Sequence, residues 1–350
     1  DYETRAFVPD TANAKPIKLY TLTNSNGMEV CITNFGGRIV SIMVPNKNGE
    51  LVDVACGFDK VENYFPWNYE TDFGCSVGRY ANRINGATFT IPGEEAPVVL
   101  DKNNNGVHSL HGGFTGWQYQ VYDVVSASDN SLTIKRISPD GDNKFPGNVE
   151  ASVTFALDED NAISITYEAV TDKPTVLNMT NHTYFNLSGD PTQTILEDSL
   201  YVNASNFTPV DDTYMTTGEI KSVEGTLFDF TKMKTIGQDI TDENLKNDEQ
   251  LRNGNGYDHN WVLDTKGDDK VPAAILKSAK SGIMLTVYTN EPGIQVYTGN
   301  FLDGKAHGKH GIDYQQRAAI CLETQKYPDT PNKPEWPSAT LKPGETYKSH

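Results

Sequence analysis

The chain has 350 residues, of which 37% are hydrophobic and 10% aromatic, enough for one large or two ordinary folded domains. It carries 29 basic and 47 acidic residues, and a net charge of −18 would repel phosphate backbones and anionic lipid headgroups, which argues against nucleic-acid binding. No apolar run approaches the roughly 20 residues that a spanning helix needs, so we expect no membrane span.

Short segments in which polar and apolar residues alternate recur along the whole chain and predict β-strands. They cover residues 28–35, 131–138, 150–157, 162–169, 283–290, 293–300 and 317–324. The third and fourth segments are joined by the turn sequence "DEDN", which predicts a hairpin. Clusters of Gly, Asn, Asp and Pro separate the segments and predict turns.

A convincing helix pattern is rare. Residues 241–253, "TDENLKNDEQLRN", predict one short helix with Thr241 or Asp242 as its N-cap. Many short strands with few helices indicate an all-β protein, a large antiparallel β-sandwich or barrel. No low-complexity linker or propeller-like repeat is visible, so we expect residues 1–350 to form a single domain.

The four cysteines do not show the spacing of a zinc or redox motif. They are Cys31, Cys56, Cys75 and Cys321. Three lie in apolar, strand-like surroundings, which favours buried free thiols. Cysteine usage therefore does not identify the compartment: a cytoplasmic protein, or an exported one whose leader was removed upstream of Asp1, both stay open.

The stretch "LNMTNHTYFNLSGD" (177–190) contains a lone histidine, His182. If it is a strand, one polar face consists of Asn178, Thr180, His182 and Tyr184. The other face consists of Leu177, Met179, Thr183 and Phe185 and is interrupted by Asn181. His182 is then either a buried histidine satisfied by hydrogen bonds or a proton-transfer group, and the neighbouring Asn and Thr residues are candidates for fixing its tautomer.

Two later strands also carry polar groups on one face. In 293–299, Gln295 and Tyr297 point opposite to Ile294 and Val296. In 318–324, the face with Ala319, Cys321 and Glu323 lies opposite to Ile320 and Leu322. An ionised Glu is seldom buried without a partner. Glu323 is therefore either paired with a neighbour or placed in a ligand site.

The remaining polar clusters lie beside glycines or turns. "GRYANRING" (78–86) holds Arg79, Asn82 and Arg83, "VHSLHGGFTGW" (107–117) holds His111 and Trp117, and "NGYDHNWVLD" (255–264) holds Asp258. Each has a structural alternative: Arg83 could bind backbone carbonyls, Asp258 could form an Asx turn, and His111 could belong to a turn.

Taken in order, these stretches resemble the aldose 1-epimerase, or galactose mutarotase, family. The resemblance runs through "NFGGRIVSIMVPNKNG", "GRYANRI", "SLHGG", "NHTYFNL", "YDHNW" and "PGIQVYTGN" to "ICLETQKYPDTPNKPEWPSATLKPGETY" and covers nearly the whole chain. It implies a galactose mutarotase-like supersandwich with a sugar cleft. It also implies interconversion of the α and β anomers of free hexoses such as galactose and glucose, with no metal or organic cofactor.

The resemblance also implies residue roles. The family's catalytic acid falls on His182 and its base on Glu323. Its sugar-contacting residues fall on Asn82, Arg83, His111, Asp258 and Gln295. All seven positions have the residue type of the family pattern. We further expect Trp117 or another aromatic residue to stack on the sugar. A monomer and a homodimer both stay open.

Three other functions compete with this interpretation. A sugar-binding module without catalysis would not require both His182 and Glu323. A glycoside hydrolase would need two carboxylates, for which Glu323 and Asp258 are available, but it leaves His182 unexplained. A hexose-6-phosphate epimerase of similar fold would need a basic cluster, for which Arg79 and Arg83 are the nearby candidates.

Overall fold

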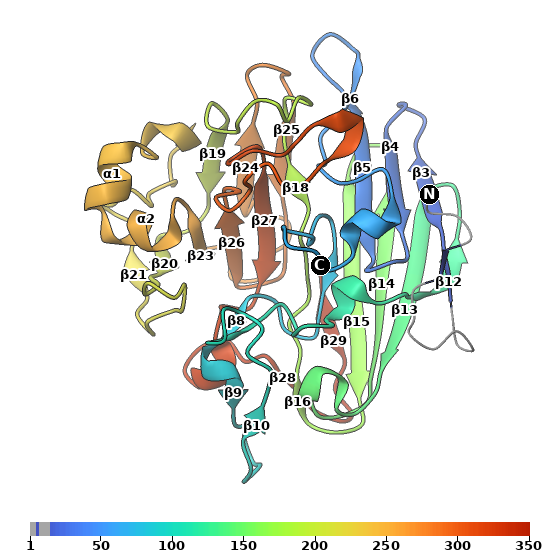
Figure 1. Cartoon of the computed structure of the whole chain (residues 1–350), viewed down its shortest axis with the longest axis vertical. Coiled ribbons are helices and arrows are strands. Elements are labelled where there is room, and N and C mark those ends of the chain that lie inside the picture. Colours follow the sequence, from blue (N-terminus) through green and yellow to red (C-terminus); the bar gives the residue numbers. More distant parts are fainter. Residues whose placement is uncertain (1–4, 7–14) are drawn as a thin grey trace.

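The alternating segments form antiparallel strands, which a computed structural model describes for residues 5–6 and 15–350. The strands fall into two halves that lie side by side, with the termini of the described chain in the first half (Figure 1). Each half is built from two larger sheets, so that one face of each sheet is buried. The prediction of a mostly antiparallel all-β fold is confirmed.

The first half consists of a four-stranded and a five-stranded sheet. The four-stranded sheet has the order β3 (Leu19–Thr23), β4 (Glu29–Thr33), β5 (Arg38–Pro45) and β6 (Leu51–Asp53). The five-stranded sheet has the order β12 (Asp123–Ala127), β13 (Ser131–Ser138), β14 (Val149–Leu157), β15 (Ile163–Thr171) and β29 (Tyr347–Ser349). β3 packs against β13 and β14. The predicted hairpin is formed by β14 and β15.

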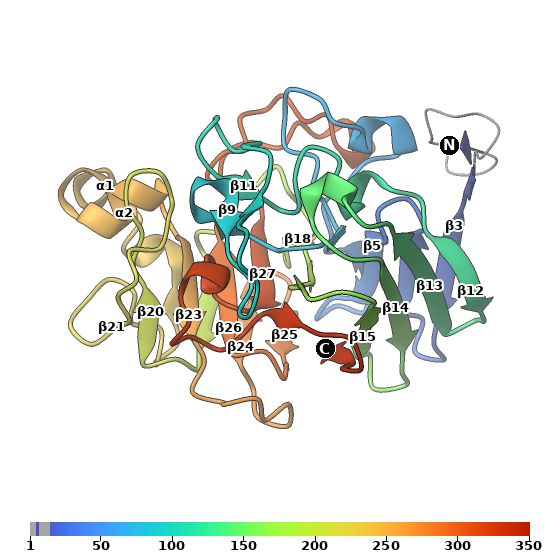
Figure 2. The ribbon, with the colours of Figure 1, turned by 90° about the horizontal axis from the view of Figure 1, so that it is seen from below.

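The second half contains a six-stranded and a four-stranded sheet (Figure 2). The six-stranded sheet has the order β18 (Tyr184–Phe185), β27 (Ile320–Gln325), β26 (Gly293–Tyr297), β23 (Asp258–Val262), β20 (Asn206–Thr208) and β21 (Lys221–Ser222). The four-stranded sheet has the order β22 (Lys234–Thr235), β19 (Ser199–Val202), β24 (Ala274–Lys277) and β25 (Met284–Val287).

Short ribbons and turns of 3₁₀ helix connect the sheets. The ribbons pair β1 (Arg5–Ala6) with β2 (Pro16–Ile17), β9 (Thr88–Phe89) with β10 (Val98–Val99), β8 (Arg83–Ile84) with β11 (Ser109–Leu110), β7 (Ser76–Val77) with β17 (Thr180–Asn181), and β16 (Thr175–Val176) with β28 (Thr340–Leu341). The 3₁₀ turns are η2 (Val61–Tyr64), η3 (Asn85–Ala87), η4 (Trp117–Tyr119), η5 (Asp142–Lys144), η6 (Ile236–Gln238), η7 (Lys309–Gly311) and η8 (Thr330–Asn332).

The largest hydrophobic cluster extends through both halves. It includes Val30 of β4 and Val153 of β14 from the first half, and Trp261 of β23 and Val296 of β26 from the second. Burying these side chains contributes roughly 1.5–3 kcal/mol each. Because the cluster is continuous, the two halves are held in a fixed relation, and the β18 edge of the six-stranded sheet lies between them (Figures 1 and 2).

The predicted helix over 241–253 is wrong in one respect, since the segment forms two helices. They are α1 (Asp242–Asn247) and α2 (Glu249–Gly254), and the chain is extended at Asp248. Thr241 caps α1 as predicted, and Asp248 caps α2 by accepting from the N–H of Leu251. A second capping residue in the middle of the pattern starts a new helix. Among the described residues, no helix is long and apolar enough to cross a membrane.

The segment around His182 also differs from the predicted continuous strand. It is divided among β16, β17 and β18, because its backbone bonds to three different partners, β28, β7 and β27. His182 lies between β17 and β18. The predicted shared polar face holds only in part: the ring of Tyr184 lies 5.0 Å from that of His182, whereas the Asn178 side chain bonds to the backbone of Lys326.

Candidate active site

His182 and Glu323 lie side by side although 141 positions separate them. His182 Nε2 is 3.5 Å from Glu323 Oε1, and both side chains are buried. Cys321, two residues before Glu323 on β27, brings its sulfur to 3.5 Å from His182 Nδ1. Ile320 and Leu322 belong to the hydrophobic core on the other face. The predicted facing of Cys321 and Glu323 is therefore confirmed.

Strand register places the other polar groups of the six-stranded sheet beside this pair. One row across the sheet consists of Tyr184, Cys321, Tyr297 and Asp258, and the next consists of Glu323 and Gln295. Residues in register on neighbouring strands project from the same face. Gln295 Nε2 donates to Asp258 Oδ1 over 2.9 Å. Asp258 thus lies in a strand, β23, and the Asx-turn alternative is wrong.

Glu323 is an unusual buried carboxyl group. Its Oε2 atom is buried and has no hydrogen-bond partner among the described residues. Burial raises the pKa of Glu323 well above its ordinary value, and the nearby carboxylates of Asp258 and Asp72 raise it further, while Arg83 opposes them. An unpartnered buried oxygen costs about 1–3 kcal/mol, so this atom is prepared to accept a hydrogen bond from something that enters the site.

His182 is fixed by its backbone and by Cys321. Its N–H donates to the carbonyl of Cys75, and its carbonyl accepts from the N–H of Gly74, each over 2.9 Å. Burial raises the pKa of the Cys321 thiol, so its sulfur keeps a proton that it can donate to His182 Nδ1. The other ring nitrogen, Nε2, faces Glu323. Burial also lowers the pKa of His182.

Asn82, Arg83 and His111 lie where β8 and β11 meet. Asn82 and His111 both have positive φ, 64° and 50°. The Asn82 N–H donates to His111 Nδ1, and the His111 N–H donates to the Asn82 carbonyl, each over 3.0 Å. The ring of His111 stands edge-on to that of His182 at 5.1 Å. His111 is therefore both a turn residue and a neighbour of His182, and burial lowers its pKa to about 3.

The glycines of these two motifs allow the loops to approach closely. A Cβ on Gly78 would lie 2.1 Å from the ring of Trp117, and one on Gly112 would lie 2.0 Å from the carbonyl oxygen of Gly78. Trp117 is fully buried in the core, and its Nε1 donates to Asp142. The prediction that Trp117 stacks on a sugar is wrong, because its ring fills the space behind the loops.

Arg83 is not confined to backbone carbonyls. Its Nε donates to Asn104 Oδ1 over 2.9 Å, and its guanidinium lies over the ring of Tyr214 at 5.0 Å. Burial lowers the pKa of Arg83, and the negative charge of Asp258 opposes this shift. Burial in turn raises the pKa of Asp258, and Arg83 opposes that shift. The two groups are thus electrostatically coupled within the site.

Arg79 is a structural residue. Its guanidinium donates to Ser138 Oγ and to the backbone carbonyls of Ser138, Pro139, Pro146 and Gly147. Only 1% of Arg79 is exposed. The prediction that it could contribute to a phosphate-binding cluster is therefore wrong, since its donors are already used.

Three residues of this region were not identified from the sequence. Glu70 accepts from the hydroxyls of Tyr184 (2.6 Å) and Tyr297, and burial raises its pKa to about 7. Asp72 lies beside His111 and His182. Phe301, 44% exposed, contacts the rings of Tyr214 and Tyr297. These residues come from loops and turns without periodicity, so no sequence pattern could have assigned them.

Two sets of side chains have donor atoms within 4.8 Å of one another, as a metal site requires: Asp72, His111 and His182, and His182, Cys321 and Glu323. In the first set, His111 Nδ1 already accepts from the Asn82 N–H, so Nε2 carries the proton and offers no lone pair. In the second, the raised pKa of Cys321 keeps it a thiol, not the thiolate that binds metal. The chemistry of these donors suits proton transfer better.

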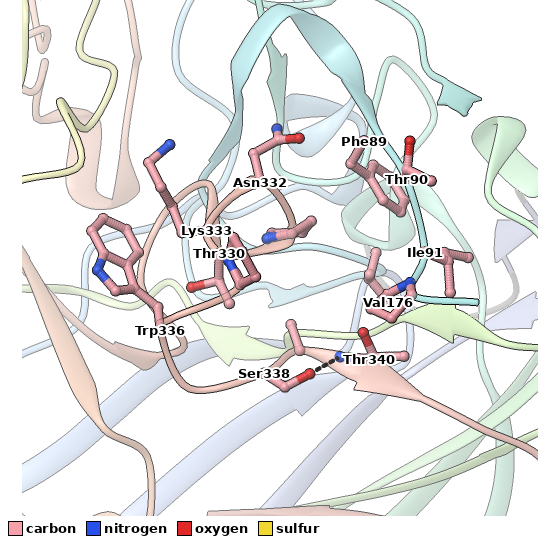
Figure 3. Close-up of a pocket in the computed structure, with 14 residues that line it drawn as sticks. Phe89, Thr90, Ile91, Val176, Thr330, Asn332, Lys333, Trp336, Ser338 and Thr340 are labelled. Atoms are coloured by element: carbon pink, nitrogen blue, oxygen red, sulfur yellow. Dashed lines mark hydrogen bonds between the residues drawn. The ribbon is translucent and has the colours of Figure 1, made fainter. Parts of the chain in front are cut away.

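Two cavities lie apart from this cluster. One, of about 320 Å³, lies between the β9 turn and the segment that leads to β28, with Trp336 and Lys333 in its wall (Figure 3). Lys333 is paired with Asp329. The other, of about 610 Å³, is mostly apolar and lies on the opposite side of β17 and β27, where Thr180 and Leu322 line it. Neither cavity contains the residues predicted to form the site.

Comparison with known proteins gives a consistent result. The family model described as aldose 1-epimerase matches residues 18–350. A galactose mutarotase of Bos taurus is 39% identical over 92% of this chain and 90% of its own length. An aldose 1-epimerase of Escherichia coli K12 is 39% identical over 99% of this chain and 96% of its own length. The solved structure of an aldose epimerase homologue from C. elegans covers 95% of this chain and 97% of its own, with 32% identity and a TM-score of 0.85.

Proposed function

The chain belongs to the aldose 1-epimerase family and is an isomerase of that type, and from this premise we propose that it interconverts the α and β anomers of free hexoses, galactose and glucose in particular. His182 is the general acid and Glu323 the general base. The observation that carries the proposal is the Glu323 carboxyl group, whose Oε1 atom lies 3.5 Å from His182 Nε2 and whose buried Oε2 atom has no hydrogen-bond partner among the described residues.

The spacing of the two groups suits the reaction. Mutarotation opens a hemiacetal ring by protonating the ring oxygen and removing the proton of the anomeric hydroxyl. Both oxygens are bonded to C1, so the acid and the base must lie close together. His182 Nε2 and Glu323 Oε1 are 3.5 Å apart, longer than a good hydrogen bond between them. Each is therefore free to turn to its own sugar oxygen.

The electrostatics of the pair suit a proton shuttle. Ring opening starts from imidazolium and carboxylate and ends with imidazole and carboxylic acid, and closure on the other face of the aldehyde reverses this. In water the charged pair is favoured, because an imidazole binds a proton more tightly than a carboxylate. Burial lowers the pKa of His182 and raises that of Glu323, which brings the two forms closer in energy.

The sugar is held by the residues around this pair. Arg83 offers a donor fork, and the Asp258 carboxylate accepts from hydroxyl groups. Gln295 orients Asp258 through its hydrogen bond, and Asn82 and His111 border the other side. Trp117 is fully buried, so it cannot take the stacking role that we had expected for it. Phe301 has an exposed face that is available to stack on the apolar face of the sugar ring.

The competing functions are less well supported. A hydrolase would use two carboxylates, whereas the close partner of Glu323 is a histidine. A passive binding module would not require a histidine and a carboxyl group 3.5 Å apart in a buried site. A phosphorylated hexose would need a cationic cluster, and Arg79 is already bound to backbone carbonyls.

The test is polarimetry of freshly dissolved α-D-galactose and α-D-glucose. We expect wild-type enzyme to accelerate mutarotation, and His182→Asn and Glu323→Gln each to lose about 10²–10⁴-fold in kcat, because each removes one proton-transfer group. Asp160→Asn, in the exposed turn between β14 and β15, is the matched control and should keep wild-type rates.

Calorimetry of galactose binding separates catalysis from binding. Glu323→Gln should still bind the sugar within about tenfold of wild type, because the amide keeps the shape of the side chain. Wild-type rates in both site variants would overturn the acid–base assignment. Release of sugar from an aryl galactoside would favour a hydrolase instead.

A further inference from the structure

Asp72 lies next to the proposed acid without being part of the family pattern in the sequence. Its carboxylate, His111 and His182 have donor atoms within 4.8 Å of one another. Asp72 is partly exposed, but its Oδ1 atom is buried and has no hydrogen-bond partner among the described residues. The carboxylate is therefore not used by the surrounding backbone.

The backbone around Asp72 is tied to His182 itself. Arg38 of β5 donates from its guanidinium to the carbonyls of Thr71 (2.5 Å) and Phe73 (3.0 Å), the two residues that flank Asp72. Two residues later the chain pairs with His182, through Gly74 and Cys75. Asp72 is thus held on both sides, and its side chain is directed by the same segment that fixes the histidine.

The next step follows from this geometry. It rests on the function proposed above but concerns a different residue. We propose that Asp72 is a positioning residue of the reaction: its carboxylate, beside His111 and His182, stabilises the imidazolium form in which His182 protonates the ring oxygen. A buried imidazolium is costly without a nearby negative charge.

Other charged and titratable groups also face His182, and their effects have different signs. Arg38 from β5 opposes protonation, whereas Asp72 favours it. From β27, Glu323 is the reaction partner and Cys321 is a neutral thiol. From the β11 loop, His111 is kept neutral by burial, with a pKa of about 3. Tyr184 of β18 packs against the ring and stays un-ionised, because burial raises its pKa.

These signs predict the pH profile of the isosteric variant Asp72→Asn. The alkaline limb of kcat/KM reports loss of the proton from His182, and removing the negative charge lowers the pKa of that group. The acid limb reports protonation of Glu323. Asp72 raises the pKa of Glu323, so removing its charge lowers that pKa and moves the acid limb to lower pH as well. We expect both limbs to shift to lower pH, the alkaline limb by about 1 unit. Asp72→Glu should restore part of the shift, and Asp160→Asn should cause none.

A second measurement does not depend on turnover. The ring ¹⁵N signals of His182, assigned by comparison with His182→Asn, should titrate about 1 unit lower in Asp72→Asn than in wild type. The inference would be overturned if the titration of His182 and both limbs of the kcat/KM profile were the same in Asp72→Asn as in wild type. A uniform loss of rate at every pH, without a shift, would show Asp72 to be merely structural. If wild type lacked mutarotase activity, the titration would still test Asp72, so the two failures are distinguishable.

Discussion

At the scale of single residues, the site depends on groups whose ordinary chemistry is altered by burial. Glu323 is 2% exposed and His182 is 3% exposed. In the same surroundings the carboxyl pKa moves up and the imidazole pKa moves down. Opposite shifts follow because burial disfavours whichever form is charged. These two shifts oppose the preference for the charged pair that holds in water, as proton exchange in a reversible isomerisation requires.

Phe301 provides a prediction about binding that is separate from proton transfer. Its ring contacts Tyr214 and Tyr297 and leaves 44% of the residue exposed. We expect Phe301→Ala to raise KM for galactose about 2–13-fold, the equivalent of the roughly 0.5–1.5 kcal/mol that stacking on one aromatic face contributes. Because Phe301 does not contact His182 or Glu323, kcat should stay within about threefold of the wild-type value.

Steady-state polarimetry checks this, with Phe301→Tyr as the control that keeps the aromatic face. Val125→Ala, at a more exposed apolar residue on β12, should leave both constants unchanged. A loss of kcat at constant KM would contradict the stacking role.

At the scale of elements, the positions of Gln295 and Glu323 are set by strand register. β26 and β27 pair Gln295 with Glu323, and β23 and β26 pair Asp258 with Tyr297. A slip of one residue in the strand pairing would move these polar side chains into the core and bring Ile294 and Val296 to the face that carries the candidate site. The hydrophobic face therefore fixes the register, and the register brings the polar groups together.

The contact between Gly78 and Trp117 gives a prediction about stability. A Cβ at residue 78 would lie 2.1 Å from the Trp117 ring, which is fully buried and cannot move away. We expect Gly78→Ala to lower the free energy of unfolding by about 1–3 kcal/mol, as overpacking usually does. Urea denaturation followed by fluorescence measures this.

A double-mutant cycle supplies the control. In the background of Trp117→Leu, which shortens the side chain, Gly78→Ala should cost at least about 1 kcal/mol less than it does in wild type. Equal costs in the two backgrounds would show that the ring is not what excludes the methyl group.

At the scale of the whole molecule, the net charge bears on the proposed substrate class. The chain has 47 acidic and 29 basic residues. The site itself contains the carboxyl groups of Glu70, Asp72, Asp258 and Glu323, and their mutual repulsion contributes to the raised pKa of Glu323. A neutral sugar enters such a field without electrostatic cost, whereas a phosphorylated sugar is repelled.

We therefore expect kcat/KM for galactose 6-phosphate to be at least about tenfold lower than for galactose, and the difference to narrow when salt rises from about 0.05 to 0.5 M, because salt screens repulsion. 6-O-Methylgalactose, neutral but similarly substituted, separates size from charge. A phosphate ester used as well as galactose at low salt would favour the hexose-6-phosphate epimerase instead.

The sequence by itself determined the fold class and indicated residues of the candidate site. Alternation with period two predicted β13, β14, β15 and the facing of Glu323, because burial on one face of a strand leaves a direct record in the residue order. The motif resemblance then directed attention to His182, which alternation alone left open, and the site residues that it implied lie around the same rows of the sheet.

Only the tertiary structure decided the rest. The segment around His182 changes partners twice, so one alternating pattern could not describe it. Trp117 and Arg79 proved to be buried, and Asp72 and Phe301 were brought in from turns. The physical reason is that a turn has no periodicity, and that proximity between residues far apart in the chain arises from sheet packing, which no local pattern records.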